Sequence, residues 1–126
     1  MKAIVVVVVG GLVLTGIACG SGLGWSVGVS EGKVAGGEVF VASGCKGCHE
    51  DAGESIAPSL VGLYGRDVLL EGGDTVLAGE DYLRESILFP SARLVEGYAP
   101  IMPGFQGLLT DEQVDELIAY IRSLAG

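Results

Sequence analysis

The residues Cys45-Lys46-Gly47-Cys48-His49 form the pattern C-x-x-C-H, two cysteines separated by two residues and followed at once by a histidine. This pattern is the attachment signature of c-type haem. Two thioethers must reach the two vinyl groups on one edge of the porphyrin, and the next residue must then place an imidazole beneath the iron. One helical turn achieves both. The motif therefore predicts a covalently bound haem c on Cys45 and Cys48, with His49 as an axial ligand of the iron.

Two other interpretations of these cysteines are weaker. A thioredoxin-like redox pair also uses C-x-x-C, but it follows a strand in a βαβ context, and no such alternation surrounds this motif. A zinc site needs further ligands, and the only other cysteine is Cys19, close to the N-terminus. Because the motif also contains the only histidine of the chain, haem attachment is the favoured interpretation.

The second axial ligand follows by elimination. A single histidine excludes bis-histidine ligation within one chain, and of the two methionines Met1 belongs to the N-terminal leader. The other, Met102, lies between Pro100 and Pro103, and these prolines keep the segment extended and stiff. A methionine that only fills a core is expected on an apolar helical stripe instead. Ligation by histidine and methionine raises the haem potential and leaves no open position on the iron, which favours electron transfer over oxygen chemistry.

Composition excludes several other classes of protein. The chain has 126 residues, with 16 acidic side chains against 7 basic ones and a net charge of -9. Nucleic-acid binding requires a surplus of Lys and Arg, so it is excluded. Three cysteines and one histidine fall short of the usual zinc-finger and iron–sulfur ligand sets. They are also too few for a disulfide scaffold.

The first thirty residues have the layout of an export signal. Lys2 precedes a nearly continuous apolar run, Ala3–Cys19, and no charged residue occurs from Ala3 to Ser30. Three interpretations compete for this segment: a cleaved signal peptide, a lipoprotein leader, or an uncleaved membrane anchor. All three place the rest of the chain outside the cytoplasm, where haem attachment in bacteria is completed.

Cys19 and Trp25 bear on the choice between these three. The segment 14–19 resembles a bacterial lipobox, in which small residues precede a lipidated cysteine, although Gly16 stands where that family prefers leucine. The uncharged stretch is 28 residues long, more than the roughly 20 that span a bilayer, and Trp25 is placed like an interfacial anchor. Lipidation of Cys19 and a retained helix are equally favoured, ahead of a soluble product. We expect a protein anchored in a bacterial cell membrane, with its haem domain on the periplasmic side.

The chain divides into three parts: a leader or anchor at 1–19, a linker at 20–35 and a haem domain at 36–126. From Cys19 through Gly37 the chain has seven glycines and three serines, a composition typical of a flexible linker.

Two helices are predicted in the haem domain. One covers 81–89 and is stopped by Pro90. The other starts at a capping box formed by Thr110 as N-cap and Gln113 three residues later. Its apolar stripe at i, i+3, i+4 and i+7 is typical of a half-buried helix; the stripe consists of Val114, Leu117, Ile118 and Ile121.

From about 36 to 124 the chain resembles the class I monohaem cytochromes c. The haem motif and the Met102 segment carry this resemblance, together with Gly36 and Phe40 before the motif and the segment 57–66, Ala-Pro-Ser-Leu-Val-Gly-Leu-Tyr-Gly-Arg. The resemblance implies an all-α fold of three to five helices around one haem, in which Tyr120 and Leu117 contact Gly36 and Phe40. It also implies three residues of the haem environment. These are Pro58, whose carbonyl accepts a hydrogen bond from Nδ1 of His49; Tyr64; and Arg66, which approaches a haem propionate.

The segment 82–105 is similar to two more specific groups. One is the cytochrome domain fused to subunit II of some haem–copper oxidases, and the other is the membrane-anchored monohaem subunit of alternative complex III, a quinol-oxidising complex. The oxidase subunit carries a copper domain for which this chain has neither the length nor the histidines, so an independent anchored subunit fits better. The segment 72–79 is more apolar than these relatives lead us to expect.

Two function classes follow from these observations. The first is electron transfer without catalysis, by a subunit of a respiratory or photosynthetic complex or by an independent cytochrome that donates to a terminal oxidase. The second is a ligand-binding or peroxidase-like haem, which needs an open iron position and an acid–base group that a chain with one histidine lacks. We expect the membrane, other subunits and a redox partner with a basic docking surface as partners, and no small-molecule substrate.

Overall fold

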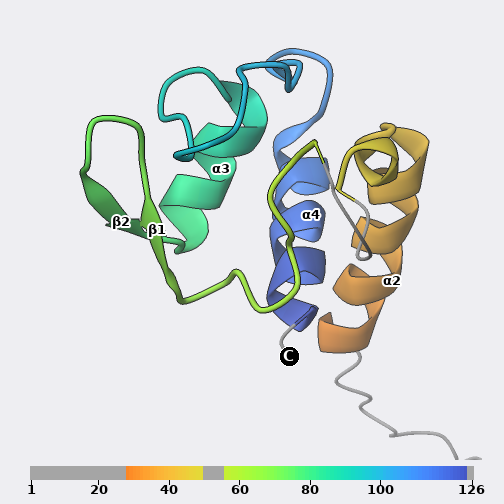
Figure 1. Cartoon of the computed structure of the whole chain (residues 1–126). Coiled ribbons are helices and arrows are strands. Elements are labelled where there is room, and N and C mark those ends of the chain that lie inside the picture. The colour runs from red at the N-terminus through yellow and green to blue at the C-terminus, as the bar shows by residue number, and fades with distance from the viewer. Residues whose placement is uncertain (1–27, 50–55, 125–126) are drawn as a thin grey trace, which may run out of the picture.

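A computed structural model describes residues 28–49 and 56–124. In this part of the chain the elements run α2 (Gly28–Ala42), the short 3-10 helix η3 (Cys45–Gly47), β1 (Asp67–Leu69), β2 (Thr75–Leu77), α3 (Glu80–Leu88) and α4 (Asp111–Ser123) (Figure 1). The predicted anchor at 1–19, with Cys19, lies outside the described residues. None of the described helices is long and apolar enough to cross a membrane.

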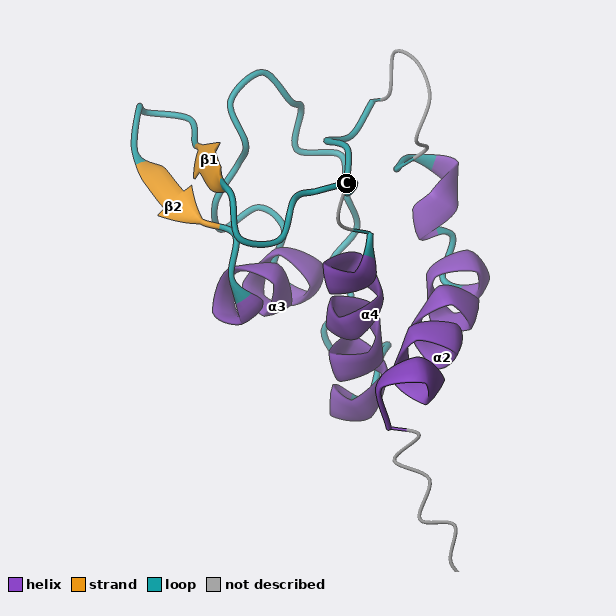
Figure 2. Ribbon diagram, turned by 90° about the horizontal axis from the view of Figure 1, so that it is seen from below, coloured by secondary structure: helices purple, strands orange, loops and turns teal. Residues whose placement is uncertain are grey.

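Helices α2 and α4 lie side by side in both ribbon views (Figures 1 and 2). Their backbones come close at Gly36, where an added Cβ would stand only 2.0 Å from the carbonyl oxygen of Glu116. One turn later the ring of Phe40, 6% exposed, packs against the ring of Tyr120 at a centroid distance of 5.2 Å. The expected contacts of Tyr120 with Gly36 and Phe40 are therefore present, and they join the first described helix to the last.

Helix α2 starts earlier than the composition indicated. It begins at Gly28, so residues 28–35, which were assigned to the linker, are helical. A helix that packing has nucleated extends by adding one hydrogen bond for each residue fixed, even through glycines that disfavour it.

Helices α3 and α4 lie within one residue of their predicted positions. Helix α3 ends at Leu88, and Phe89 is its C-cap directly before Pro90. At the start of α4 both halves of the capping box are present: Gln113 N–H donates to Thr110 Oγ1 at 3.2 Å, and Thr110 N–H donates to Gln113 Oε1 at 3.0 Å. The apolar stripe of α4 is buried, as its spacing predicted.

The all-α prediction missed a small β-hairpin. Strands β1 and β2 pair antiparallel, with Val68 opposite Val76. The turn passes through Gly72 and Gly73, whose φ angles of 97° and 94° favour glycine. This hairpin overlaps the segment 72–79, which is more apolar than the similar cytochromes lead us to expect. Leu70, which directly follows β1, forms an antiparallel β-bridge with Val95. This bridge joins the hairpin to the connection between α3 and α4.

Candidate haem site

A cavity of about 460 Å³ opens between α2, α3, α4 and the loops that connect them. Its walls are largely apolar, and they include the buried side chains of Phe40, Leu83, Ile87, Leu117 and Ile121. The volume lies in the range typical of pockets that bind cofactors and other small molecules. A large apolar group can therefore be enclosed at the centre of the domain.

The C-x-x-C-H motif lies at one edge of this cavity. Gly44 lies between α2 and η3 and is the N-cap of η3, with a φ of 79°. The turn is closed by two backbone bonds, in which Cys48 N–H and His49 N–H donate to the carbonyl of Cys45 at 3.2 and 3.0 Å. Cys45 is half-buried and lines the cavity, whereas Cys48 is exposed and is not among the lining residues. Partial burial also raises the pKa of the Cys45 thiol.

His49 is held by the hydrogen bond that the resemblance implied. Its Nδ1 lies 2.8 Å from the carbonyl oxygen of Pro58. A carbonyl can only accept, so Nδ1 is the donor in this bond, and in the neutral ring Nε2 then keeps its lone pair. His49 lines the cavity, and Nε2 of its neutral ring would be the atom available to a haem iron. Metal-binding histidines commonly have such a partner, because it fixes the ring orientation and raises its basicity.

Met102 lines the same cavity as His49 and is half-buried. It belongs to the long connection between α3 and α4, in which Tyr98, Ala99 and Pro100 also line the cavity. The structure thus brings together an imidazole and a thioether from distant parts of the chain, with two cysteines near one edge. This set of donors, enclosed by apolar walls, fits haem c.

The other two predicted residues differ in their placement. Arg66 lines the cavity and is exposed, which is compatible with a contact to a propionate. Tyr64 is not among the residues that line the cavity, and its role in the haem environment stays a prediction. Its hydroxyl accepts a hydrogen bond from Arg122 at 2.8 Å, and the Arg122 guanidinium lies 4.5 Å from the centroid of its ring. The preceding residue, Leu63, lines the cavity. The side chain of Tyr64 points toward Arg122, near the end of α4.

Sequence reasoning missed several residues of the cavity wall. Tyr82 is buried in α3 and lines the cavity, and Tyr98 lines it from the segment before Met102. Tyr82 could have been found from the sequence, because it extends the apolar side of the 81–89 helix that Leu83 and Ile87 define. Tyr98 has no comparable periodic signal, since it lies in an irregular loop.

The comparisons with known proteins agree with this site. Residues 34–125 match the family model of cytochrome c. A search of curated proteins found no match. The family match covers most of the chain, so the protein belongs to the cytochrome c family. Membership implies a covalently bound haem c, for which Cys45, Cys48 and His49 provide the attachment motif.

Proposed function

We propose that this protein carries single electrons and does no chemistry on a substrate. The observation that supports this most strongly is that His49 and Met102 line one cavity, so these two residues would hold the iron of a haem bound there. The haem supplies the reversible change between ferric and ferrous iron. The chain's own residues orient the imidazole, present the thioether and exclude water with apolar walls. Such a closed site favours electron transfer over binding of oxygen or peroxide.

The visible spectrum tests this proposal on the holo-protein. We expect a weak far-red band in the oxidised form, which reports the sulfur–iron bond in this class of chromophore, and slow binding of CO by the reduced form. Absence of the band together with rapid CO binding would favour a ligand-binding haem and reject the electron carrier.

We further propose that the protein is a membrane-anchored subunit of a quinol-oxidising complex similar to alternative complex III, passing electrons to a periplasmic carrier or a terminal oxidase. The similarity of segment 82–105 and the apolar run before residue 20 support this proposal. An independent anchored cytochrome that donates to a terminal oxidase is the alternative. Co-purification of the tagged full-length chain with quinol-oxidising activity is expected for the first and not for the second.

The intact mass of the membrane-extracted holo-protein tests the anchor. A lipoprotein gives a chain that starts at an acylated Cys19, whereas a retained helix gives a chain that starts at or near Met1. Either mass supports anchoring. An unacylated product that starts after the leader and stays in the soluble fraction contradicts it.

The charge of the haem domain supports a basic redox partner. From Glu31 onward the chain holds all 16 acidic residues and 6 of the 7 basic ones, a net charge of -10. Three of the described arginines are engaged within the domain: Arg84 with Asp115, Arg93 with Glu85 and Arg122 with Tyr64. Each of the two ion pairs cancels one acid against one arginine, and Arg122 keeps its charge beside the neutral tyrosine, so the net charge of -10 remains as a negative field at the surface.

Electron transfer to a basic partner should depend strongly on salt. Raising the ionic strength from about 0.01 to about 0.15 M shortens the Debye length from roughly 30 to 8 Å. We expect the bimolecular rate constant to fall by about tenfold or more over this range. Stopped-flow mixing of the reduced holo-protein with a basic electron acceptor measures this rate. A rate that does not change, or that rises with salt, argues against a basic docking partner.

A further inference from the structure

The connection that carries Met102 is long and irregular. Between the end of α3 and the start of α4 the chain runs through residues 89–110 without a helix or a strand, and we call this segment the methionine loop. Loops of this length need specific contacts if they are to keep one conformation. The position of the Met102 thioether therefore depends on what fastens the loop to the rest of the domain.

Beyond Met102, the loop is fastened to the last turn of α3. Phe105 N–H donates to the carbonyl of Ile87 at 3.2 Å. Gly104 lies against the same turn, where an added Cβ would be 3.1 Å from the carbonyl oxygen of Leu88. These contacts are made by the backbone, so they fix the exit of the loop whatever its side chains are.

Before Met102, the loop has two attachments. The backbone of Leu94 and Glu96 bonds to the hairpin, with Glu71 N–H donating to Leu94 at 2.9 Å and Glu96 N–H donating to Leu69 at 3.0 Å. The second attachment is made by side chains: Nε of Arg93 lies 2.7 Å from Oε2 of Glu85, on α3. This ion pair is a side-chain contact between α3 and the first part of the methionine loop, which we call its entry.

The ion pair is better shielded than an ordinary surface pair. The two side chains are 46% and 35% exposed, and the Oε2 atom of Glu85 is itself buried and accepts no hydrogen bond, so Arg93 stabilises it by charge alone. An exposed pair contributes little, because water and salt screen it. A buried charged oxygen without its partner is costly. Removal of either side chain should therefore loosen the entry of the loop.

Arg93 also begins a continuous stretch of the cavity wall. It lines the haem cavity, and so do Leu94, Val95 and Glu96, which follow it directly. After Gly97 the wall resumes with Tyr98 and continues toward Met102. Arg93 therefore belongs to the same wall of the cavity as Met102, and the backbone bonds of Leu94 and Glu96 to the hairpin lie between the two.

We propose that Glu85 and Arg93 are positioning residues for the sixth ligand, and that their ion pair keeps the methionine loop closed so that Met102 stays on the iron. The proposal rests on the proposed role of Met102 as axial ligand. The pair touches neither the iron nor the thioether. It acts by setting the free-energy cost of moving the loop away, which is the cost that a competing ligand must overcome.

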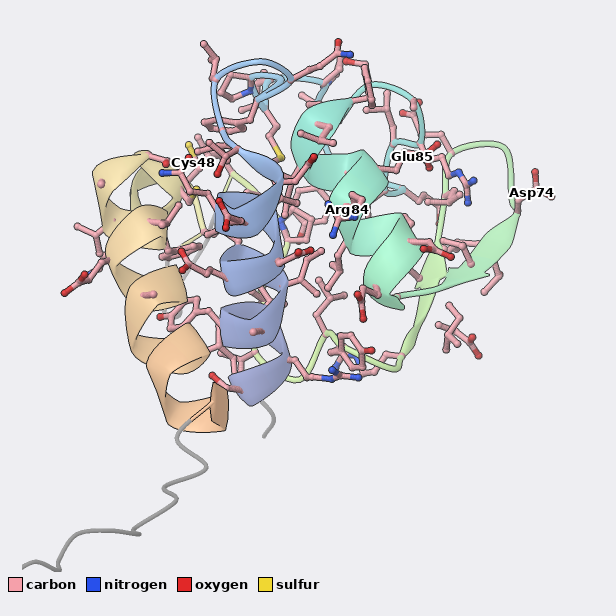
Figure 3. All side chains as sticks on the ribbon, turned by 180° about the vertical axis from the view of Figure 1, so that it is seen from behind. Cys48, Asp74, Arg84 and Glu85 are labelled. Atoms are coloured by element: carbon pink, nitrogen blue, oxygen red, sulfur yellow. The ribbon has the colours of Figure 1, made fainter. Side chains whose placement is uncertain are left out.

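The second ion pair of α3 provides a matched control. Arg84, the residue next to Glu85, pairs with Asp115 of α4, and Figure 3 shows the two side chains leaving α3 in different directions. Asp115 is on a helix and does not line the cavity. Glu85→Gln and Asp115→Asn each remove one acidic charge from one ion pair, but only the first affects the methionine loop.

The test is a titration of the oxidised holo-protein with imidazole, followed by loss of the sulfur–iron band. We expect Glu85→Gln to bind imidazole about tenfold more tightly than the wild type, because the partly buried ion pair that closes the loop is lost. Asp115→Asn should stay within about twofold of the wild type. Thermal unfolding of the two variants, measured in parallel, separates a general loss of stability from an effect on the loop.

Arg93→Gln breaks the same pair from the loop side and replaces Glu85→Gln if that variant does not accumulate. Combining both substitutions should add little to either alone, since the two side chains act through one contact. Equal imidazole affinities in Glu85→Gln, Arg93→Gln and Asp115→Asn, or additive effects in the double variant, overturn the proposal. A wild-type protein without the sulfur–iron band would instead reject Met102 as ligand, so the two failures are distinguishable.

Discussion

Met102→Ala is expected to abolish the sulfur–iron band of the oxidised protein and to lower its midpoint potential. Alanine cannot reach the iron, and the thioether that favours the ferrous state is lost. Axial ligands set haem potentials over a range of roughly 0.8 V, so we expect a fall on the order of 100 mV or more. The reduced variant should also bind CO rapidly, because one axial position is open. Redox titration and CO mixing of the purified holo-protein measure both effects.

Ile101→Ala is the control for this substitution. Ile101 is the preceding residue of the same loop, is 56% exposed and does not line the cavity. Its truncation removes an apolar side chain from the loop without touching the ligand set. We expect the band and the potential of this variant to match the wild type. An unchanged potential in Met102→Ala would show that another group holds the sixth position.

Gly36→Ala is expected to destabilise the domain by about 3 kcal/mol, the upper part of the usual range for overpacking. The new methyl group would stand 2.0 Å from the carbonyl oxygen of Glu116 and 2.8 Å from Cβ of Tyr120. Both atoms are held close to the helix backbone and cannot turn aside, so α2 and α4 must separate. Because natural domains have only about 5–15 kcal/mol of stability, the unfolding midpoint should fall by roughly 10 °C or more.

The next residue supplies the matched control. At Gly37 an added Cβ would lie 3.4 Å from Cε2 of Tyr120, an ordinary contact with a side chain. Gly37→Ala should therefore leave the unfolding midpoint unchanged or raise it, since alanine is favoured over glycine in a helix by about 1 kcal/mol. Thermal unfolding of the two holo-proteins, followed by circular dichroism, measures the difference. Equal midpoints would show that α2 and α4 can separate at Gly36 without cost.

Features set by residues close in sequence could be predicted well. The capping box of α4 needs only Thr110 and Gln113, three positions apart, and both of its hydrogen bonds are present. The turn of the haem motif is equally local, closed by bonds from residues 48 and 49 to Cys45. In such cases spacing alone determines which groups can meet, so the sequence carries the information.

Features set by contacts between distant residues were harder to predict. The hairpin escaped the all-α expectation because its strands have three residues each, too few to display a period. Tyr64 was placed with the haem environment because its neighbours are, but the direction of its side chain depends on Arg122, which is distant in the sequence. The start of α2 was missed because glycine-rich composition argues for a linker, whereas packing against α4 favours a helix.

The contact between α2 and α4 also has a consequence for the order of events during biogenesis. Gly36 and Phe40 find their partners on α4, the final helix of the described domain, so α2 cannot complete its packing until α4 is available. Contacts between residues as far apart in the sequence as those of α2 and α4 form late and slowly in folding. Until α4 packs against α2, Cys45 and Cys48 therefore lie on an open chain, so haem can be attached before the domain closes around it.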